Sequence, residues 1–173
     1  LGMPLGAVRE LIPRLEAEGL LHTVPQRGLQ IAHVDIKLIN NAFQLRLLLE
    51  REAAIRFTTS VSDADLATIE QAHLQIVRRA RRGQIDAALL SDATMVDWGL
   101  HDLMIDASRN ELISDVYRIN SLRVRLIKLE GTTLSPDVLL PAMEEHLWFL
   151  DAIKQRDPTE AARRLTHHIE SAH

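Results

Sequence analysis

The chain has 173 residues, 46% of them hydrophobic, and a formal net charge of −4. This composition excludes a disordered chain, and the acidic charge gives no general affinity for nucleic acid. No apolar run approaches the roughly 18 residues that span a bilayer, so we expect a soluble protein without a membrane partner. Cysteine is absent, which excludes disulfides and thiolate metal sites and is compatible with a reducing cytoplasm.

The first 34 residues predict one helix followed by a two-stranded hairpin. A helical pattern covers 5–18 and Gly19 ends it. Two apolar runs, 20–24 and 29–32, then flank the turn sequence Pro25-Gln26-Arg27-Gly28. A helix followed by a two-stranded wing is typical of the second half of a winged helix-turn-helix. The alternative is an ordinary helix and hairpin that cap the rest of the chain.

From residue 35 to residue 171 the pattern is helical almost throughout, because apolar residues recur at three- and four-residue steps. Short connections between these helices predict a mostly α fold, an antiparallel six-helix bundle. Most of the predicted helices begin at a polar capping residue. The six are 35–57 from Asp35, 62–82 from Ser62, 86–107 from Asp86, 110–129 from Asn110, one from Ser135 that contains His146, and one from Asp157 that contains His168.

Four residues in three of these helices form a candidate metal site. Asp97 and His101 stand four residues apart, so their side chains share one helix face. His146 and His168 can approach the same point from neighbouring helices. Three imidazoles and one carboxylate suit a divalent transition metal, zinc before nickel or manganese, and leave coordination positions free. The alternative is that these histidines are unrelated surface or core residues.

The remaining histidines are not predicted to bind the metal. His167 is the rival of His168, but the two point about a hundred degrees apart, and we choose His168 because it shares a helical stripe with Ala161 and Leu165. Four others have no partner at metal-ligand spacing and are expected to be solvated: His22, His33, His73 and His173.

Arginines are the candidates for binding an acidic effector. Arg46 could meet a carboxylate, because a guanidinium is a planar two-pronged donor, or it could pair with Glu50 one turn away. Arg123 and Arg125 are weaker candidates, since an exposed helix face explains them nearly as well. Trp98 follows the metal ligand Asp97 but points elsewhere, so we expect it to pack in the core.

Several motifs resemble those of one protein family. The stretch from Ala7 to Leu21 and then Val24-Pro25-Gln26-Arg27-Gly28 resembles the recognition helix and wing of GntR-type transcriptional regulators. The rest resembles the FCD effector domain of their FadR branch. The matching motifs are Leu45-Arg46 with Glu50, Asp97 with His101, Ala107-Ser108 with Asn110, Glu145-His146, and His168-Ile169.

The resemblance implies a homodimeric cytoplasmic regulator, a repressor before an activator, that binds operator DNA and responds to a small organic acid held beside a metal ion. Residues 1–34 would be part of a winged helix-turn-helix, and 35–173 the metal- and effector-binding domain. We expect the chain to be a fragment, because the helices that precede the recognition helix in such a domain are missing. The predicted DNA-binding residues are Arg9, Arg14, Arg27 and Gly28.

Two features weaken the predicted DNA contact, and two other functions stay open. Leu5 stands where the family carries a basic residue, and the three arginines of residues 1–34 are balanced by three glutamates. The first alternative function is a metal-dependent hydrolase in which Glu145 serves as a base. The second is a dimerisation bundle in which the metal only stabilises the fold.

Overall fold

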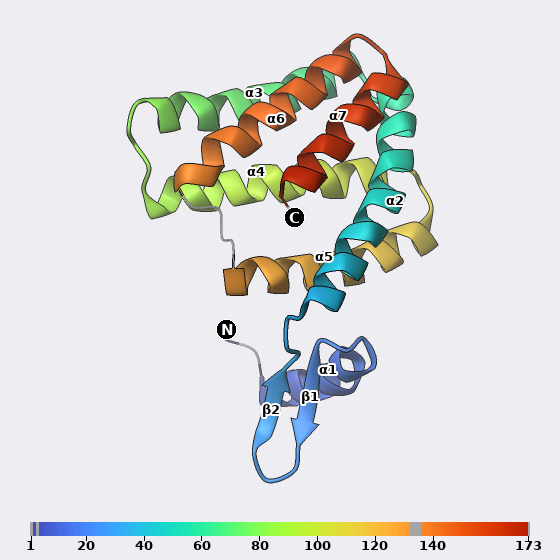
Figure 1. Ribbon diagram of the computed structural model, residues 1–173, viewed down its shortest axis with the longest axis vertical. Helices are drawn as coiled ribbons and strands as arrows, with labels where there is room; N and C mark the ends of the chain where they lie inside the picture. The colour runs from blue at the N-terminus through green and yellow to red at the C-terminus, as the bar shows by residue number, and fades with distance from the viewer. Residues whose placement is uncertain (1, 3, 132–135, 173) are drawn as a thin grey trace.

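The computed structural model describes residues 2, 4–131 and 136–172 (Figure 1). A mostly α fold, with one helix and a hairpin ahead of six further helices, confirms the predicted fold class. In chain order the elements of the described residues are α1 (Leu5–Ala17), β1 (Leu21–Val24), β2 (Gly28–Ile31), α2 (Ile36–Ser60), α3 (Asp63–Arg81), α4 (Ala87–Asp106), α5 (Glu111–Gly131), α6 (Pro136–Lys154) and α7 (Pro158–Ser171).

The N-terminal helix and hairpin lie together at the start of α2 (Figure 1). Strands β1 and β2 pair antiparallel, with Val24 opposite Gly28. Gln26 and Gly28 have φ angles of 62° and 88°, so the turn needs a glycine-like backbone, which Gly28 supplies. The Glu16 carboxylate accepts a hydrogen bond of 2.6 Å from the Thr23 N–H and so ties α1 to β1.

Helix caps lie where the sequence predicts them. Asn110 accepts hydrogen bonds from the Leu112 and Ile113 N–H groups, so this side chain is the predicted cap. Ser135, the predicted cap of α6, lies outside the described residues. The other predicted caps each accept a hydrogen bond from the N–H three residues on: Asp35 from Leu38, Ser62 from Asp65, and Asp157 from Glu160. Asp86, predicted only as the first residue of a helix, caps α4 in the same way by accepting from the Leu89 N–H.

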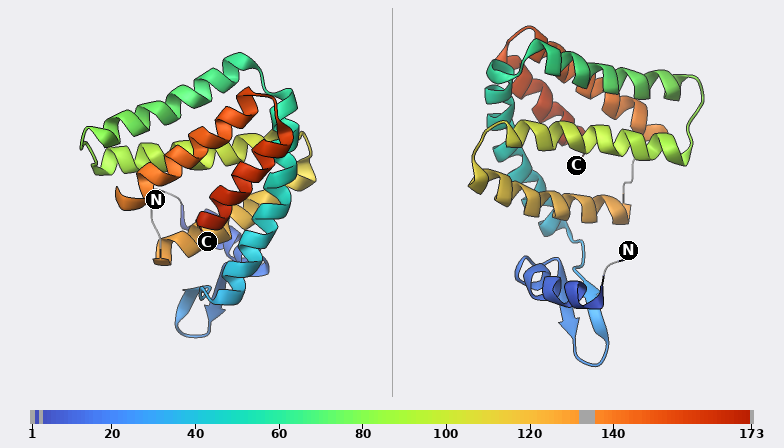
Figure 2. Two further views of the ribbon diagram at one scale, coloured as in Figure 1. Left: turned by 45° about the horizontal axis from the view of Figure 1, so that its top comes forward. Right: turned by 180° about the vertical axis from the view of Figure 1, so that it is seen from behind.

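Helices α2 to α7 form the predicted bundle. Helix α2 packs against α4, α5, α6 and α7, so it touches most of the other helices. Seen from behind, α3, α4 and α5 lie one below another (Figure 2). Helix α6 packs on α3 and α4, and α7 packs on α2 and α6. The core between them is apolar, and each fully buried large side chain contributes about 1.5–3 kcal/mol. Its centre includes Phe57, Met104, Phe149, Leu150, Ile153 and Leu165.

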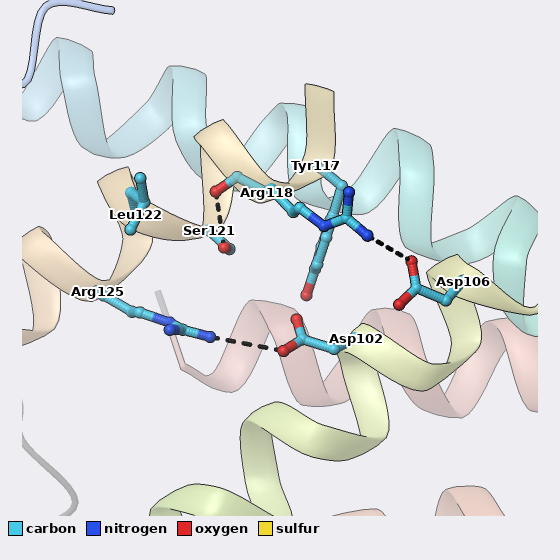
Figure 3. Close-up of a pocket in the computed structure, with 7 residues that line it drawn as sticks. All are labelled: Asp102, Asp106, Tyr117, Arg118, Ser121, Leu122 and Arg125. Carbon is cyan, nitrogen blue, oxygen red and sulfur yellow. Dashed lines mark hydrogen bonds and ion pairs between the residues drawn. The ribbon is translucent and has the colours of Figure 1, made fainter. Parts of the chain in front are cut away.

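Two polar features interrupt this apolar packing. Seven polar or charged side chains meet near the middle of the bundle, each at most 2% exposed: Arg46, Glu50, His73, Asp97, His101, His146 and His168. A hollow of about 310 Å³ lies between α4 and α5, lined partly by Asp102, Tyr117 and Arg125 (Figure 3). None of the helices in the described part of the chain is both long and apolar enough to cross a membrane.

Candidate metal centre

The structure brings the four predicted metal ligands together. Asp97 and His101 come from α4, His146 from α6 and His168 from α7, and one donor atom of each lies within 4.8 Å of the donor atoms of the others. All four side chains are buried. His167, the rival of His168, is 58% exposed and points away from this cluster. The site therefore has a fixed donor set held on three helices.

The tautomer of His101 follows from its two partners. Its Nδ1 lies 2.7 Å from a carboxylate oxygen of Glu50. Burial raises the pKa of Glu50, but the charge of Arg46 and the hydrogen bonds from Arg46 and His101 outweigh burial and lower it to about 2. An ionised carboxylate only accepts, so Nδ1 carries the proton. Nε2 lies 2.8 Å from Nη2 of Arg46, which only donates, and so presents a lone pair.

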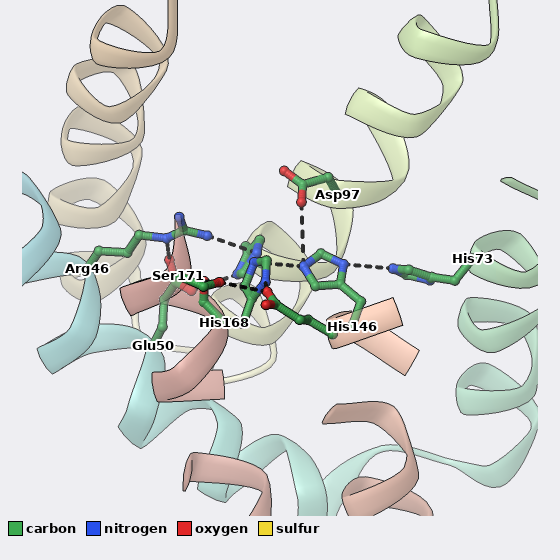
Figure 4. Close-up of polar contacts among 9 residues, drawn as sticks. Arg46, Glu50, His73, Asp97, His146, His168 and Ser171 are labelled. Atoms are coloured by element: carbon green, nitrogen blue, oxygen red, sulfur yellow. Dashed lines mark hydrogen bonds and ion pairs between the residues drawn. The ribbon is translucent and has the colours of Figure 1, made fainter. Parts of the chain in front are cut away.

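His168 has the same arrangement with a different carboxylate. Its Nδ1 donates to Glu145 over 2.8 Å, and the Ser171 hydroxyl donates to the same oxygen (Figure 4). Burial raises the pKa of Glu145, but these two hydrogen bonds outweigh burial and lower it. Burial also lowers the pKa of His168, so this imidazole is neutral at pH 7. Its Nε2 therefore has a free lone pair toward the cluster.

His146 is oriented by a fourth histidine, His73 on α3. Nδ1 of His73 donates to the Ile69 carbonyl over 2.8 Å, and burial lowers the pKa of His73, so its Nε2 is left as an acceptor. Nδ1 of His146 lies 3.0 Å from that nitrogen and donates to it (Figure 4). Burial and the surrounding histidines hold the pKa of His146 well below its usual value. Nε2 of His146 thus faces the cluster without a proton.

These residues fit a divalent metal ion. Nε2 of His146 lies 3.0 Å from Nε2 of His168 and 3.5 Å from a carboxylate oxygen of Asp97. Two nitrogen lone pairs that face each other repel unless a cation lies between them. Two nitrogens bound at about 2.1 Å are about 3.4 Å apart at a tetrahedral angle and about 3 Å apart at a right angle. The observed 3.0 Å therefore suits neighbouring positions of a site with more than four ligands. The partner behind His146 is the neutral His73, whereas the partners behind His101 and His168 are carboxylates, so His73 adds no negative charge to the site.

The expectation that His73 is solvated is wrong. Its side chain is 1% exposed and bonded to His146. The sequence separates these two residues by 73 positions, and no spacing rule within one helix links them. The burial of Leu66, Ile76, Val77 and Ala80 on the same helix marks an inward face, and His73 is three residues before Ile76. That stripe is the signal that could have identified it.

Arg46 lies beside the metal ligands, as predicted. Its Nε donates to Glu50 over 2.7 Å, so the ion pair that the spacing suggests is present, and its Nη2 lies 2.8 Å from Nε2 of His101. Contact with an effector carboxylate stays a prediction. Nη1 of Arg46 is buried and has no hydrogen-bond partner among the described residues. A buried donor of this kind costs free energy until a partner reaches it. A buried water molecule or an acceptor atom of a ligand would satisfy it.

The other predicted effector arginines lie in two different places. Arg125 stacks on the Trp98 ring, 4.7 Å from its centroid, and approaches Asp102 to 3.6 Å. Trp98 packs in the core as expected, but its ring also faces these cations. The structure does not bring Arg123 to the cluster: its Nη2 donates to the Glu18 carbonyl over 2.8 Å, at the end of α1.

The predicted DNA-binding residues are on the surface of the N-terminal helix and hairpin. Arg9 and Arg14 are exposed on α1, and Arg27 and Gly28 are exposed at the tip of the hairpin. The two partly balancing glutamates have structural contacts, since Glu16 binds the Thr23 N–H and Glu18 meets Arg123. Neither glutamate is therefore paired with Arg9, Arg14 or Arg27, so a phosphate contact by these arginines would break no ion pair with Glu16 or Glu18.

Known proteins resemble this chain over most of its length. The model of the FCD domain matches residues 41–171. The HTH-type transcriptional repressor RspR of Escherichia coli K12 is 26% identical over 168 residues, which cover 94% of this chain and 69% of the repressor. The family model thus contains every residue of the metal cluster.

Solved structures share the fold. Escherichia coli McbR/YncC superposes with a TM-score of 0.78 at 19% identity, over 98% of this chain and 78% of that one. The metal-free FCD domain of the transcriptional regulator TM0439 superposes with a TM-score of 0.66 at 22% identity, over 82% of this chain and 92% of that one. The first match extends beyond the bundle to the N-terminal helix and hairpin.

Proposed function

The chain belongs to the FCD-domain branch of the GntR family of transcriptional regulators, and we propose that its bundle binds one divalent metal ion together with a small organic acid that controls DNA binding. We further propose a division into a DNA-binding part, 1–34, and a metal- and effector-binding part, 35–173. RspR is named a repressor, and this favours repression over activation for the present chain.

One observation carries the metal proposal: Nε2 of His146 and Nε2 of His168 face each other beside the Asp97 carboxylate, with a donor atom of His101 within 4.8 Å. Each of the three imidazoles is held by a partner on Nδ1, which is Glu50, His73 or Glu145. Nε2 of His101 accepts a hydrogen bond from Arg46, so this bond has to open when His101 binds the ion. Outer partners of this kind raise the basicity of an imidazole and hold its orientation. Zinc is the first choice, and nickel and manganese accept the same donors. The bound ion would supply positive charge and open coordination positions.

The acid is proposed from the residue next to these ligands. A carboxylate oxygen can fill an open metal position while Arg46 donates to its second oxygen through the unpartnered Nη1. Arg125, which stacks on the Trp98 ring, adds positive charge near the metal ligands. Arg123 has no part in this proposal, because it binds the end of α1.

Operator binding is proposed for the N-terminal helix and hairpin. Helix α1 would approach the major groove with Arg9 and Arg14, and the hairpin tip would bring Arg27 and the adjoining Gly28 backbone to the phosphates. A homodimer would present two such units to the half-sites of a pseudo-palindromic operator.

The contacts of Glu145 argue against the hydrolase alternative, in which this residue would act as the catalytic base. Glu145, the proposed catalytic carboxylate, accepts hydrogen bonds from His168 and Ser171 and so orients a metal ligand. The family assignment places the chain among regulators. A structural metal stays as the alternative that experiment separates, because it predicts metal-dependent stability without any response to an acid.

Fluorescence anisotropy with the protein's own promoter DNA tests the proposal. The titration is run at two salt concentrations with zinc-loaded protein, with chelator-treated protein, and with zinc-loaded protein plus citrate, malate or lactate. We expect a preference for promoter over random DNA and an acid-dependent change in affinity of about 5- to 150-fold. The variant Asp97→Asn should lose the response to acid. Equal binding to random DNA, or no response to any acid, would overturn the proposal.

A further inference from the structure

A second cluster of positive charge lies beside the metal centre, around the Trp98 ring. Arg46 Cζ lies 5.9 Å, Lys128 Nζ 5.3 Å and Arg125 Cζ 4.7 Å from the ring centroid. Arg46 comes from α2, and the other two from successive turns of α5. Cation–π contact stabilises each of them but does not cancel their mutual repulsion.

Lys128 is the least compensated of the three. Arg46 is paired with Glu50, and Arg125 approaches Asp102 to 3.6 Å, but among the described side chains none forms a hydrogen bond or an ion pair with Lys128. Burial lowers its pKa; Asp97 opposes this effect, and the charge of Arg46 adds to it. A half-buried ammonium group in this position favours an anion as its partner.

Building on the proposed function, we infer that the acid carries two separate anionic groups, one for the metal centre and Arg46, the other for Lys128 and Arg125 beside the Trp98 ring. The unpartnered Arg46 Nη1 then receives an acceptor, and Lys128 receives a counter-charge. A dicarboxylate meets both sets of donors, whereas a monocarboxylate leaves Lys128 without a counter-charge. The second subsite thus sets the class of acid.

Calorimetric titration of the zinc-loaded protein with matched acids tests this inference. Each pair differs only in a terminal carboxylate or methyl group: malonate and propionate, succinate and butyrate, glutarate and valerate, adipate and hexanoate. We expect at least one diacid to bind about 10- to 100-fold more tightly than its partner, because charge-assisted hydrogen bonds to the second carboxylate are gained.

Lys128→Met should remove this preference while affinity for the monoacid stays unchanged, and the matched variant of an exposed lysine, Lys37→Met, should retain the preference. Methionine keeps the apolar stem of Lys128 in place, and circular dichroism checks the fold. Equal affinity within every pair, or a preference that survives Lys128→Met, would overturn the inference and leave the proposed function standing. If no acid of either kind binds the zinc-loaded protein, the proposed function fails as well.

Discussion

Two arginine–glutamate pairs on α2 have the same spacing and different surroundings. Arg46 and Glu50 are 2% and 0% exposed, whereas Glu52 and Arg56 are 54% and 64% exposed, and both pairs are joined over 2.7 Å. Breaking a buried pair leaves one charge without compensation, and an exposed pair is screened by water. The same contact on one helix therefore has different energetic consequences, which the spacing in the sequence does not reveal.

Glu50→Gln is predicted to lower the free energy of unfolding of the metal-free protein by about 3–5 kcal/mol, because Arg46 then stays buried without a counter-charge. The matched variant Glu52→Gln should change it by less than about 1 kcal/mol. Urea unfolding followed by circular dichroism measures both. Equal decreases in the free energy of unfolding of the two variants would show that the buried pair stabilises the protein no more than the exposed pair.

His73→Phe is predicted to weaken zinc binding by about 10- to 100-fold, since Nδ1 of His146 loses the acceptor that fixes its tautomer. Phenylalanine fills the space of the imidazole, so the fold should survive. Competition with a chromophoric chelator gives the affinity, and His22→Phe, at an exposed position, is the control. Unchanged zinc affinity in His73→Phe would mean that His73 is only a packed core residue.

At the scale of single elements, the helix starts were predictable and the long-range partners were not. A cap depends on one side chain and an N–H three residues on, so Asp35, Ser62 and Asp157 could be identified from local sequence. The metal ligands Asp97 and His101 are local in the same sense, since they share a turn of α4. The contact between His73 and His146 joins two helices, and no local rule contains it.

The cap of α7 supports a metal ligand as well as a helix. Asp157 accepts a 3.0 Å hydrogen bond from the Glu160 N–H, and α7 carries His168. Asp157→Ala should lower the free energy of unfolding by about 0.5–2 kcal/mol, and Asp157→Asn, which keeps an acceptor, should retain most of it. Chemical denaturation of the three proteins measures the differences. Equal losses for alanine and asparagine would exclude capping as the cause.

At the scale of the whole molecule, α5 connects the bundle with the N-terminal helix. Arg123 binds the Glu18 carbonyl at the end of α1, and Arg125 and Lys128 on the same helix face Trp98. These three residues lie within six positions of the sequence, but the sequence does not show which of their side chains points away from Trp98 and the metal ligands. The hydrogen bond from Arg123 to the Glu18 carbonyl separates Arg123 from the other two, and local sequence does not predict it.

Arg123→Ala is predicted to speed proteolysis between α1 and α2 several-fold, because the hydrogen bond from α5 to Glu18 is lost and local opening becomes easier. Proteinase K digestion followed by mass spectrometry gives the cleavage rate and position. Arg118→Ala, on the same helix but paired with Asp106 and Asp115, is the matched control. Identical rates for Arg123→Ala and the unaltered protein would show that this contact does not hold the N-terminal segment.

The central claim is that three histidines and one aspartate of the bundle bind a divalent ion. Elemental analysis of the purified protein, equilibrated with zinc and dialysed, measures it most directly. We expect about one zinc per chain in the unaltered protein and in the exposed double variant His22→Ala, His33→Ala, and none in the double variant His101→Ala, His146→Ala. Circular dichroism establishes that both variants are folded. A full complement of zinc in folded protein that lacks His101 and His146 would contradict the account.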